Sequence, residues 1–145
     1  MALQIVESWG CAPDAKTILN IAESALQKLN PIFPEKTGEV RLHVQDFADE
    51  ETLEALYLDD AYALLGVYSG IALSLELHAV SKQCDAEIWL FRMPILRAWA
   101  EQGDITLEAL TTQTLITELA AHYRWTSTQI AGLYQAASLA PPEEV

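Results

Sequence analysis

The chain has 145 residues, 51% of them hydrophobic, and its 21 acidic and 8 basic residues give a formal net charge of −13. This length suits one domain, with a hydrophobic core that needs no disulfide or metal to stabilise it. The charge disfavours nucleic acids and anionic membrane surfaces, so neither is expected as a partner.

The cysteine content and the N-terminal segment bear on the compartment. Cys11 and Cys84 form neither a C-x-x-C pair nor a zinc-knuckle spacing, and nothing requires a disulfide between them. The first residues lack the basic region and the long apolar stretch of a secretory signal. No apolar run approaches the ~20 residues of a membrane helix. We therefore expect a cytoplasmic protein with reduced thiols.

The first half of the chain predicts a helix, a strand and a short helix. Pro13 suits the first turn of the first helix, and Asn30 with Pro31 ends it. Its apolar residues recur at helical spacing: Ile18, Ile21, Ala22, Ala25, Leu26 and Leu29. Residues 40–45 alternate between apolar and polar side chains, which indicates a half-buried strand with His43 on the polar, surface side. Asp49 is a plausible N-cap for a short helix through Leu56.

The second half predicts extended segments followed by helices. Residues 64–73 are apolar with a turn at Ser69 and Gly70, and residues 74–85 are ambiguous. Residues 86–91 form a strand, and a short helix follows over residues 94–101. Asp104 or Thr106 caps a long helix that ends at His122 or Tyr123. A capping box at residues 126 and 129 starts a last helix to about residue 139, and residues 141–145 form a frayed tail.

These elements predict an α+β fold in one domain over residues 1–140. The helices flank a few strands without alternating strictly with them, so we expect a small mixed sheet packed against a long helix and flanking helices. The sequence shows no internal repeat, low-complexity segment or interdomain linker.

Three segments together resemble the minimal bacterial zincin-like metallopeptidases, which have an MMP-like domain. Residues 64–73, LLGVYSGIAL, are similar to the family's Leu-Gly-Leu-Tyr-x-Gly-x-Pro-Leu segment, with Ala72 in place of the proline. Residues 88–95, IWLFRMPI, resemble the strand that carries a Tyr-Arg-x-Pro-Ile signature. Residues 115–127, LITELAAHYRWTS, stand where the family has His-Glu-x-x-His-His-Phe-Gly-Leu-Ser-Asp. The resemblance implies the zincin fold over about residues 15–135.

The resemblance implies a zinc site, but this chain lacks its ligands. Two histidines at i and i+4 of a helix hold the zinc in zincins, and the intervening glutamate acts on the zinc-bound water. Here the two histidine positions hold Thr117 and Ala121, and the position of the third ligand, an aspartate, holds Ser127. A methyl group binds no metal, and a neutral hydroxyl is a poor zinc ligand. We expect no zinc cofactor and no zinc-dependent peptide hydrolysis, and a chelator should leave the melting temperature unchanged.

Glu118 and His122 remain from the family's stretch, and each has an ordinary interpretation. Glu118 is a vestigial catalytic position, and as a plain helix carboxylate it hydrogen-bonds a neighbour or faces solvent. His122 is interpreted as a helix-end histidine that interacts with the dipole or a carbonyl. The two are also at i, i+4, so they could share a relocated metal. Such a site needs partners from the ambiguous segment: His78, Cys84 or Asp85.

Other residue patterns provide no better site. There is no nucleophile elbow, catalytic triad or phosphate loop. Acidic residues at 46, 49, 50 and 51 lack the calcium-loop pattern and are interpreted as a solvated cap region. The four tryptophans, at 9, 89, 99 and 125, are interpreted as core or half-buried anchors rather than a ligand-binding set.

The leading hypothesis is a non-catalytic zincin-fold protein that binds a peptide or protein in the vestigial cleft. The cleft of this fold lies between the active-site helix and an edge strand, for which residues 64–73 and 88–91 are the candidates. An extended peptide could add to that edge as a further strand. The candidate cleft residues are Tyr68, Trp89, Phe91 and Trp125.

Two alternatives stay open. One is a metal-dependent peptidase or other hydrolase with a site rebuilt around Glu118 and His122. The other is a structural role with the vacated site packed shut, where Tyr123 or Trp125 could fill the space.

Overall fold

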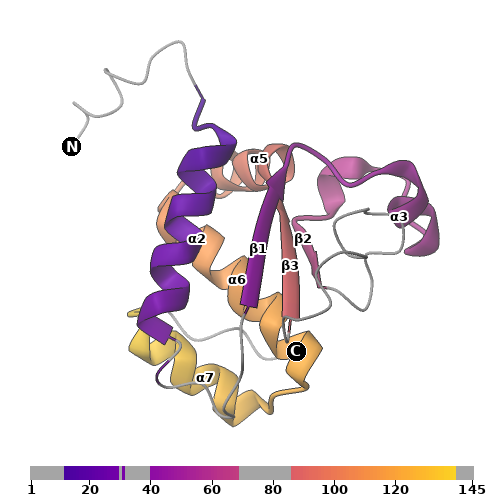
Figure 1. Cartoon of the computed structure of the whole chain (residues 1–145). Coiled ribbons are helices and arrows are strands. Elements are labelled where there is room, and N and C mark those ends of the chain that lie inside the picture. Colours follow the sequence, from indigo (N-terminus) through magenta and orange to yellow (C-terminus); the bar gives the residue numbers. More distant parts are fainter. Residues whose placement is uncertain (1–11, 30, 32–39, 69–85, 140–145) are drawn as a thin grey trace.

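The computed structural model describes residues 12–29, 31, 40–68 and 86–139. Figure 1 shows a small sheet with helices packed against it. In chain order the elements are α2 (Ala15–Leu29), β1 (Val40–Gln45), α3 (Glu50–Ala55), a 3₁₀ turn (Ala61–Ala63), β2 (Gly66–Tyr68), β3 (Ala86–Phe91), α5 (Arg92–Gln102), α6 (Leu107–Tyr123) and α7 (Ser127–Ala136). The predicted α+β class is therefore confirmed. None of these helices is long and apolar enough to cross a membrane.

The sheet is mixed, and its strand order is β1-β3-β2. β1 runs parallel to β3, in a register that pairs Val40 with Ala86 and Gln45 with Phe91. β2 runs antiparallel on the other side of β3, with Gly66 opposite Leu90. The prediction that residues 88–91 form an edge was wrong, because β3 lies in the middle of the sheet. Of the two candidate segments, only the one that contains β2 supplies an edge among the described strands.

The main core lies between the sheet and the two long helices α2 and α6. Alternate residues of β3, Ile88 and Leu90, are fully buried in this cluster. Helix α6 buries residues along most of its length and contacts α2, β2 and β3, so it runs through the middle of the helical layer (Figure 1). It is this central position that fixes the candidate site against the sheet.

The other face of the sheet has a smaller core of its own. Trp89 and Phe91 are 0% exposed and pack with Ala48, Val67 and side chains from α3. His43 was expected on the surface. Its side chain is only 17% exposed, stacks on Trp89 with ring centroids 5.0 Å apart, and lies 3.4 Å from the buried Glu87 carboxylate. The prediction for His43 was wrong, because this face is covered as well.

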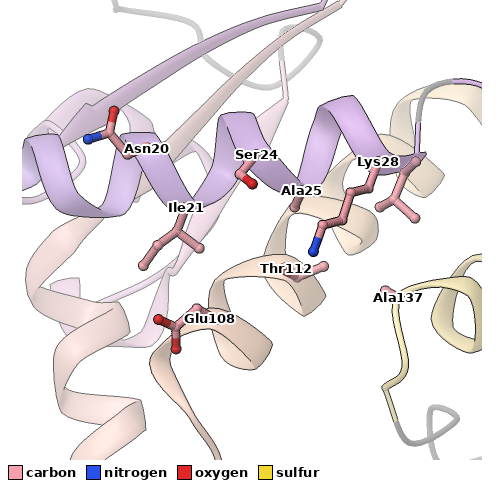
Figure 2. A pocket seen from close by; sticks show the side chains of 9 residues that line it. Asn20, Ile21, Ser24, Ala25, Lys28, Glu108, Thr112 and Ala137 are labelled. Carbon is pink, nitrogen blue, oxygen red and sulfur yellow. The ribbon is translucent and has the colours of Figure 1, made fainter.

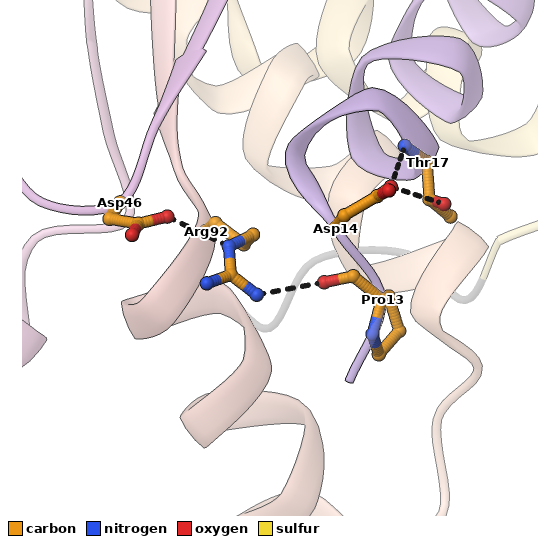
Figure 3. Close-up of polar contacts among 5 residues, drawn as sticks. All are labelled: Pro13, Asp14, Thr17, Asp46 and Arg92. Atoms are coloured by element: carbon orange, nitrogen blue, oxygen red, sulfur yellow. Dashed lines mark hydrogen bonds and ion pairs between the residues drawn. The ribbon is translucent and has the colours of Figure 1, made fainter. Parts of the chain in front are cut away.

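Arg92 ties three separate segments together at one end of the sheet. Its Nε donates to Asp46 just after β1 at 2.8 Å, and its Nη1 donates to the Pro13 carbonyl just before α2 at 3.0 Å (Figure 3). The Arg92 guanidinium lowers the pKa of Asp46. Asp14 caps α2 by accepting from the amide and hydroxyl of Thr17, so Pro13 precedes the helix rather than lying in its first turn. Arg92, which stands at the arginine of the Tyr-Arg-x-Pro-Ile signature, therefore has a structural role.

Side-chain caps begin both α6 and α7. The Thr106 hydroxyl accepts from the Ala109 amide at 3.0 Å, so Thr106 rather than Asp104 caps α6. Thr126 and Gln129 form the predicted capping box of α7. Between the helices, Arg124 adopts a left-handed conformation with φ 59° and ψ 46°. The resemblance places a glycine at this position, and the backbone keeps the conformation that glycine would permit.

Replacing Arg124 with glycine is expected to stabilise the fold. A left-handed conformation costs a residue with a side chain roughly 1–2 kcal/mol, and glycine adopts it freely but loses more entropy on folding. The net gain should be about 0.5–1 kcal/mol, seen as a higher urea midpoint. Arg124→Ala keeps the strain while removing the exposed side chain, so it should leave the midpoint nearly unchanged. Equal gains from both variants would show that the arginine side chain is responsible.

Candidate functional site

Four positions of the zincin motif lie in the last two turns of α6: Thr117, Glu118, Ala121 and His122. Thr117 and Ala121 are both exposed, one turn apart on the same face. If the protein had a purely structural role with the vacated site packed shut, apolar neighbours would bury these two side chains. Their exposure does not support that alternative. The Thr117 hydroxyl donates to the Gln113 carbonyl at 2.8 Å.

A cleft of about 360 Å³ opens beside this face, between α6 and the segment that leads into β2. Helix α7 closes it through Tyr134, whose pKa is raised by burial. The lining residues are Ala63, Leu64, Leu65, Gly66, Leu110, Gln113, Thr114, Thr117, Glu118 and Tyr134. The cleft therefore has an apolar side from residues 63–66 and a polar side from α6.

Among the described residues, Glu118 is the only carboxylate that lines the cleft. Burial raises its pKa to about 7 from the ordinary value of 4.5. Within the described part of the chain, no hydrogen-bond donor or cation is in contact with its side chain. The expected surface or hydrogen-bonded carboxylate was therefore not found. Glu118 is partly buried and carries a charge that no neighbour among these residues balances.

Gly66 sets the distance between β2 and α6. A Cβ added to it would lie 3.0 Å from the Trp89 carbonyl oxygen and 3.3 Å from Cγ of Glu118. Both contacts are too close, and the carbonyl belongs to the central strand. A glycine at this position therefore allows the Glu118 side chain to lie directly against the edge strand.

Gly66→Ala is expected to destabilise the fold by about 1–3 kcal/mol, the usual cost of an added methyl group in a packed site. Urea unfolding measures this cost. Gly132→Ala in α7 is the matched control, because nothing lies within 4 Å of its added Cβ. It should stabilise the protein by roughly 0.5–1 kcal/mol through helix propensity. A neutral Gly66→Ala would mean that α6 and β2 are farther apart than described.

The side chains at this site do not fit zinc. Zinc is held by imidazole, thiolate or carboxylate ligands. Thr117 offers a hydroxyl already bonded to a helix carbonyl, Ala121 a methyl group and Ser127, the first residue of α7, a second hydroxyl. Across residues 12–29, 40–68 and 86–139, no three His, Cys, Asp or Glu side chains come together to hold a metal ion. His78, Cys84 and Asp85 lie outside the described residues.

His122 belongs to a row of aromatic rings. Its ring meets Tyr68 edge-on with centroids 5.9 Å apart and meets Tyr123 at 4.7 Å. Tyr123 in turn stacks on Trp125 at 5.4 Å. Through these contacts, the end of α6 is held against the end of β2.

The predicted cleft residues do not line the cleft. Trp89 and Phe91 are fully buried in the smaller core, so their assignment was wrong. Trp125 is 7% exposed in the main core, and Tyr68 is half-buried beside His122. Among the described residues that line the cleft, neither Tyr123 nor Trp125 is found.

Several residues of the cleft were missed by the sequence analysis. Gln113 and Thr114 lie four and three residues before Thr117, so helical spacing could have placed them on its face. A glycine inside the apolar run at residues 64–73 was a signal for the close approach at Gly66. Nothing in the sequence indicated Tyr134, which comes from the next helix.

A second cavity, of about 300 Å³, lies between α2 and the first half of α6 (Figure 2). Ile21 and Ala25 of α2 supply apolar surface, and Ala137 closes one end. Its charged side chains, Lys28 and Glu108, are exposed. It is therefore a groove whose charged groups face solvent, whereas the Glu118 carboxylate in the other cleft is partly buried.

The fold and the cleft define the class of the protein. The α+β domain and the cleft between α6 and β2 agree with what the sequence resemblance implies. A family model described as zincin-like metallopeptidase matches residues 37–140. The chain therefore belongs to the zincin-like metallopeptidase family. No curated protein and no solved structure matches it.

Proposed function

We propose that this is a non-catalytic, cytoplasmic zincin-fold protein that binds an extended peptide, or an extended segment of a protein partner, in the cleft between α6 and β2. The observation that carries the proposal is that the cleft stays open where the zinc ligands are missing. Thr117 lines the cleft, Ala121 is exposed one turn further along α6, and Tyr134 is the one aromatic side chain among the described residues that line the cleft.

The edge of the sheet supports an extended ligand. β2 pairs with β3 along one side, and among the described residues no strand pairs with its other side. An open strand edge offers backbone amides and carbonyls to a further strand, and neighbouring pockets select its side chains. The cleft adjoins this strand at Gly66, so one side chain of an added peptide can enter it.

Peptide binding can be tested with a library of acetylated, amidated hexapeptides and fluorescence polarisation. Backbone amide shifts should then change in β2 and along residues 113–121. Thr117→Trp places a large ring at the mouth of the cleft and should abolish binding. Gln102→Trp adds the same ring at an exposed position of α5 that lines neither cavity, and should leave binding intact. Shift changes confined to the α2–α6 groove would contradict the proposal.

The competing function is a metal-dependent hydrolase rebuilt around Glu118 and His122. It predicts near-stoichiometric metal in protein purified without an affinity tag, and loss of that metal in Glu118→Ala and in His122→Ala. Such a result would overturn the non-catalytic assignment. The position of His122 between two tyrosine rings favours the non-catalytic assignment.

A further inference from the structure

We propose that the cleft selects a basic side chain of the bound peptide, arginine in preference to lysine, with Glu118 as its counter-charge. This inference rests on the proposed peptide binding and names the chemistry that the site recognises. Three features of the cleft lining support it: its hydrogen-bonding groups, its charge and its shape.

The threonine hydroxyls and the carboxylate of the polar wall offer acceptors, whereas the Gln113 amide and the Tyr134 hydroxyl can donate as well as accept. The Thr117 hydroxyl donates to the Gln113 carbonyl at 2.8 Å, and the Thr114 hydroxyl donates to the Leu110 carbonyl at 2.9 Å. Each hydroxyl has one proton, so only lone pairs of these oxygens remain for a ligand. The Glu118 carboxylate adds two acceptor oxygens when it is ionised. A wall of this kind is complementary to a ligand rich in N–H groups.

The charge of the cleft is unbalanced. Among the described residues, Glu118 is the only charged one in the lining, and no cation pairs with it. A partly buried carboxylate without a partner is unfavourable because it has lost water without gaining a counter-ion. A cation brought by the ligand would restore that pairing. The net charge of −13 also attracts basic peptides at long range.

The shape of the cleft suits a long, amphipathic side chain. Leu64, Leu65 and Leu110 provide apolar surface for a methylene stem, as lysine and arginine require. Because Gly66 has no side chain, β2 lies directly against the Glu118 side chain at this wall of the cleft. Arginine is preferred because its planar guanidinium presents five donors, which can meet the carboxylate and a threonine oxygen together.

The test uses the hexapeptide library arranged by position, so that one residue is fixed as Arg, Lys, Gln or Glu in each sublibrary. At pH 8 and low salt, the wild-type protein should bind the best Arg sublibrary at least ~10-fold more tightly than the matching Gln sublibrary. Lys should be intermediate, and Glu should not bind. Glu118→Gln keeps the shape of the side chain and should lose the preference for Arg over Gln.

Glu54→Gln is the matched control, because it removes the same charge from an exposed position in α3 that lines neither cavity. It should keep the preference of the wild type. Binding without any preference for basic residues, or a preference that survives in Glu118→Gln, would overturn this inference and leave the proposed function standing. If no sublibrary binds the wild-type protein, both are wrong.

Discussion

A chain carrying Thr117→His, Ala121→His and Ser127→Asp is expected to bind one zinc ion with a dissociation constant of about 1 µM or tighter, roughly −8 kcal/mol. The wild-type chain lacks all three ligand side chains, but the backbone that would carry them is intact. Helix α6 runs without a break through both histidine positions, and both side chains are exposed on one face. Arg124 turns the chain in the left-handed conformation, which brings Ser127 to the start of α7.

This result should appear in two measurements. Metal analysis after dialysis should give close to one zinc per chain, and saturating zinc should raise the melting temperature, because a ligand at about 100 times its dissociation constant adds roughly 2.7 kcal/mol of stability. Lys16→His with Asn20→His places an exposed i, i+4 histidine pair on α2 without a third ligand, and should bind zinc much more weakly. Equal affinities of the two variants would mean that position 127 does not reach the site.

Helix α6 was the most predictable element, and local signals explain why. The N-cap at Thr106 and the end at Tyr123 are both set by short-range interactions that can be inferred from the sequence. The order of the strands in the sheet was harder to predict from the sequence. The unbroken apolar run Ile-Trp-Leu-Phe in β3 is typical of a strand covered on both faces, which should have favoured a central position over an edge. The resemblance to a zincin cleft led instead to the edge assignment.

The candidate site was only partly predictable from the sequence. Its α6 side follows from helical spacing around Thr117, whereas Leu64, Leu65 and Tyr134 reach the cleft through tertiary packing that no local pattern encodes. The environment of Glu118 was also missed. A helix carboxylate is usually solvated, but Gly66 lets β2 lie against this one, and the loss of water follows from that contact.

Glu118→Gln is expected to stabilise the protein at pH 8 by about 2 kcal/mol, which corresponds to a rise in melting temperature of roughly 4–8 °C. Burial raises the pKa of Glu118 to about 7 in the folded state, against an ordinary value of 4.5. Between these two values the folded chain holds a proton that the unfolded chain releases. The stability of the wild type should therefore fall as the pH rises from about 4.5 to 7, and level off above it. The shift alone corresponds to roughly 3.4 kcal/mol, and partial exposure of the side chain reduces it.

The comparison across pH separates the charge of Glu118 from its packing. A protonated glutamate and a glutamine are similar in shape and neutral, so wild type and Glu118→Gln should have nearly equal stability near pH 4.5 and diverge above it. Glu54→Gln removes an exposed carboxylate and should run parallel to the wild type at every pH. If Glu118→Gln were less stable than the wild type at pH 8, the carboxylate would have to be paired with a cation in the folded protein. The cleft would then have no unbalanced charge to offer a ligand.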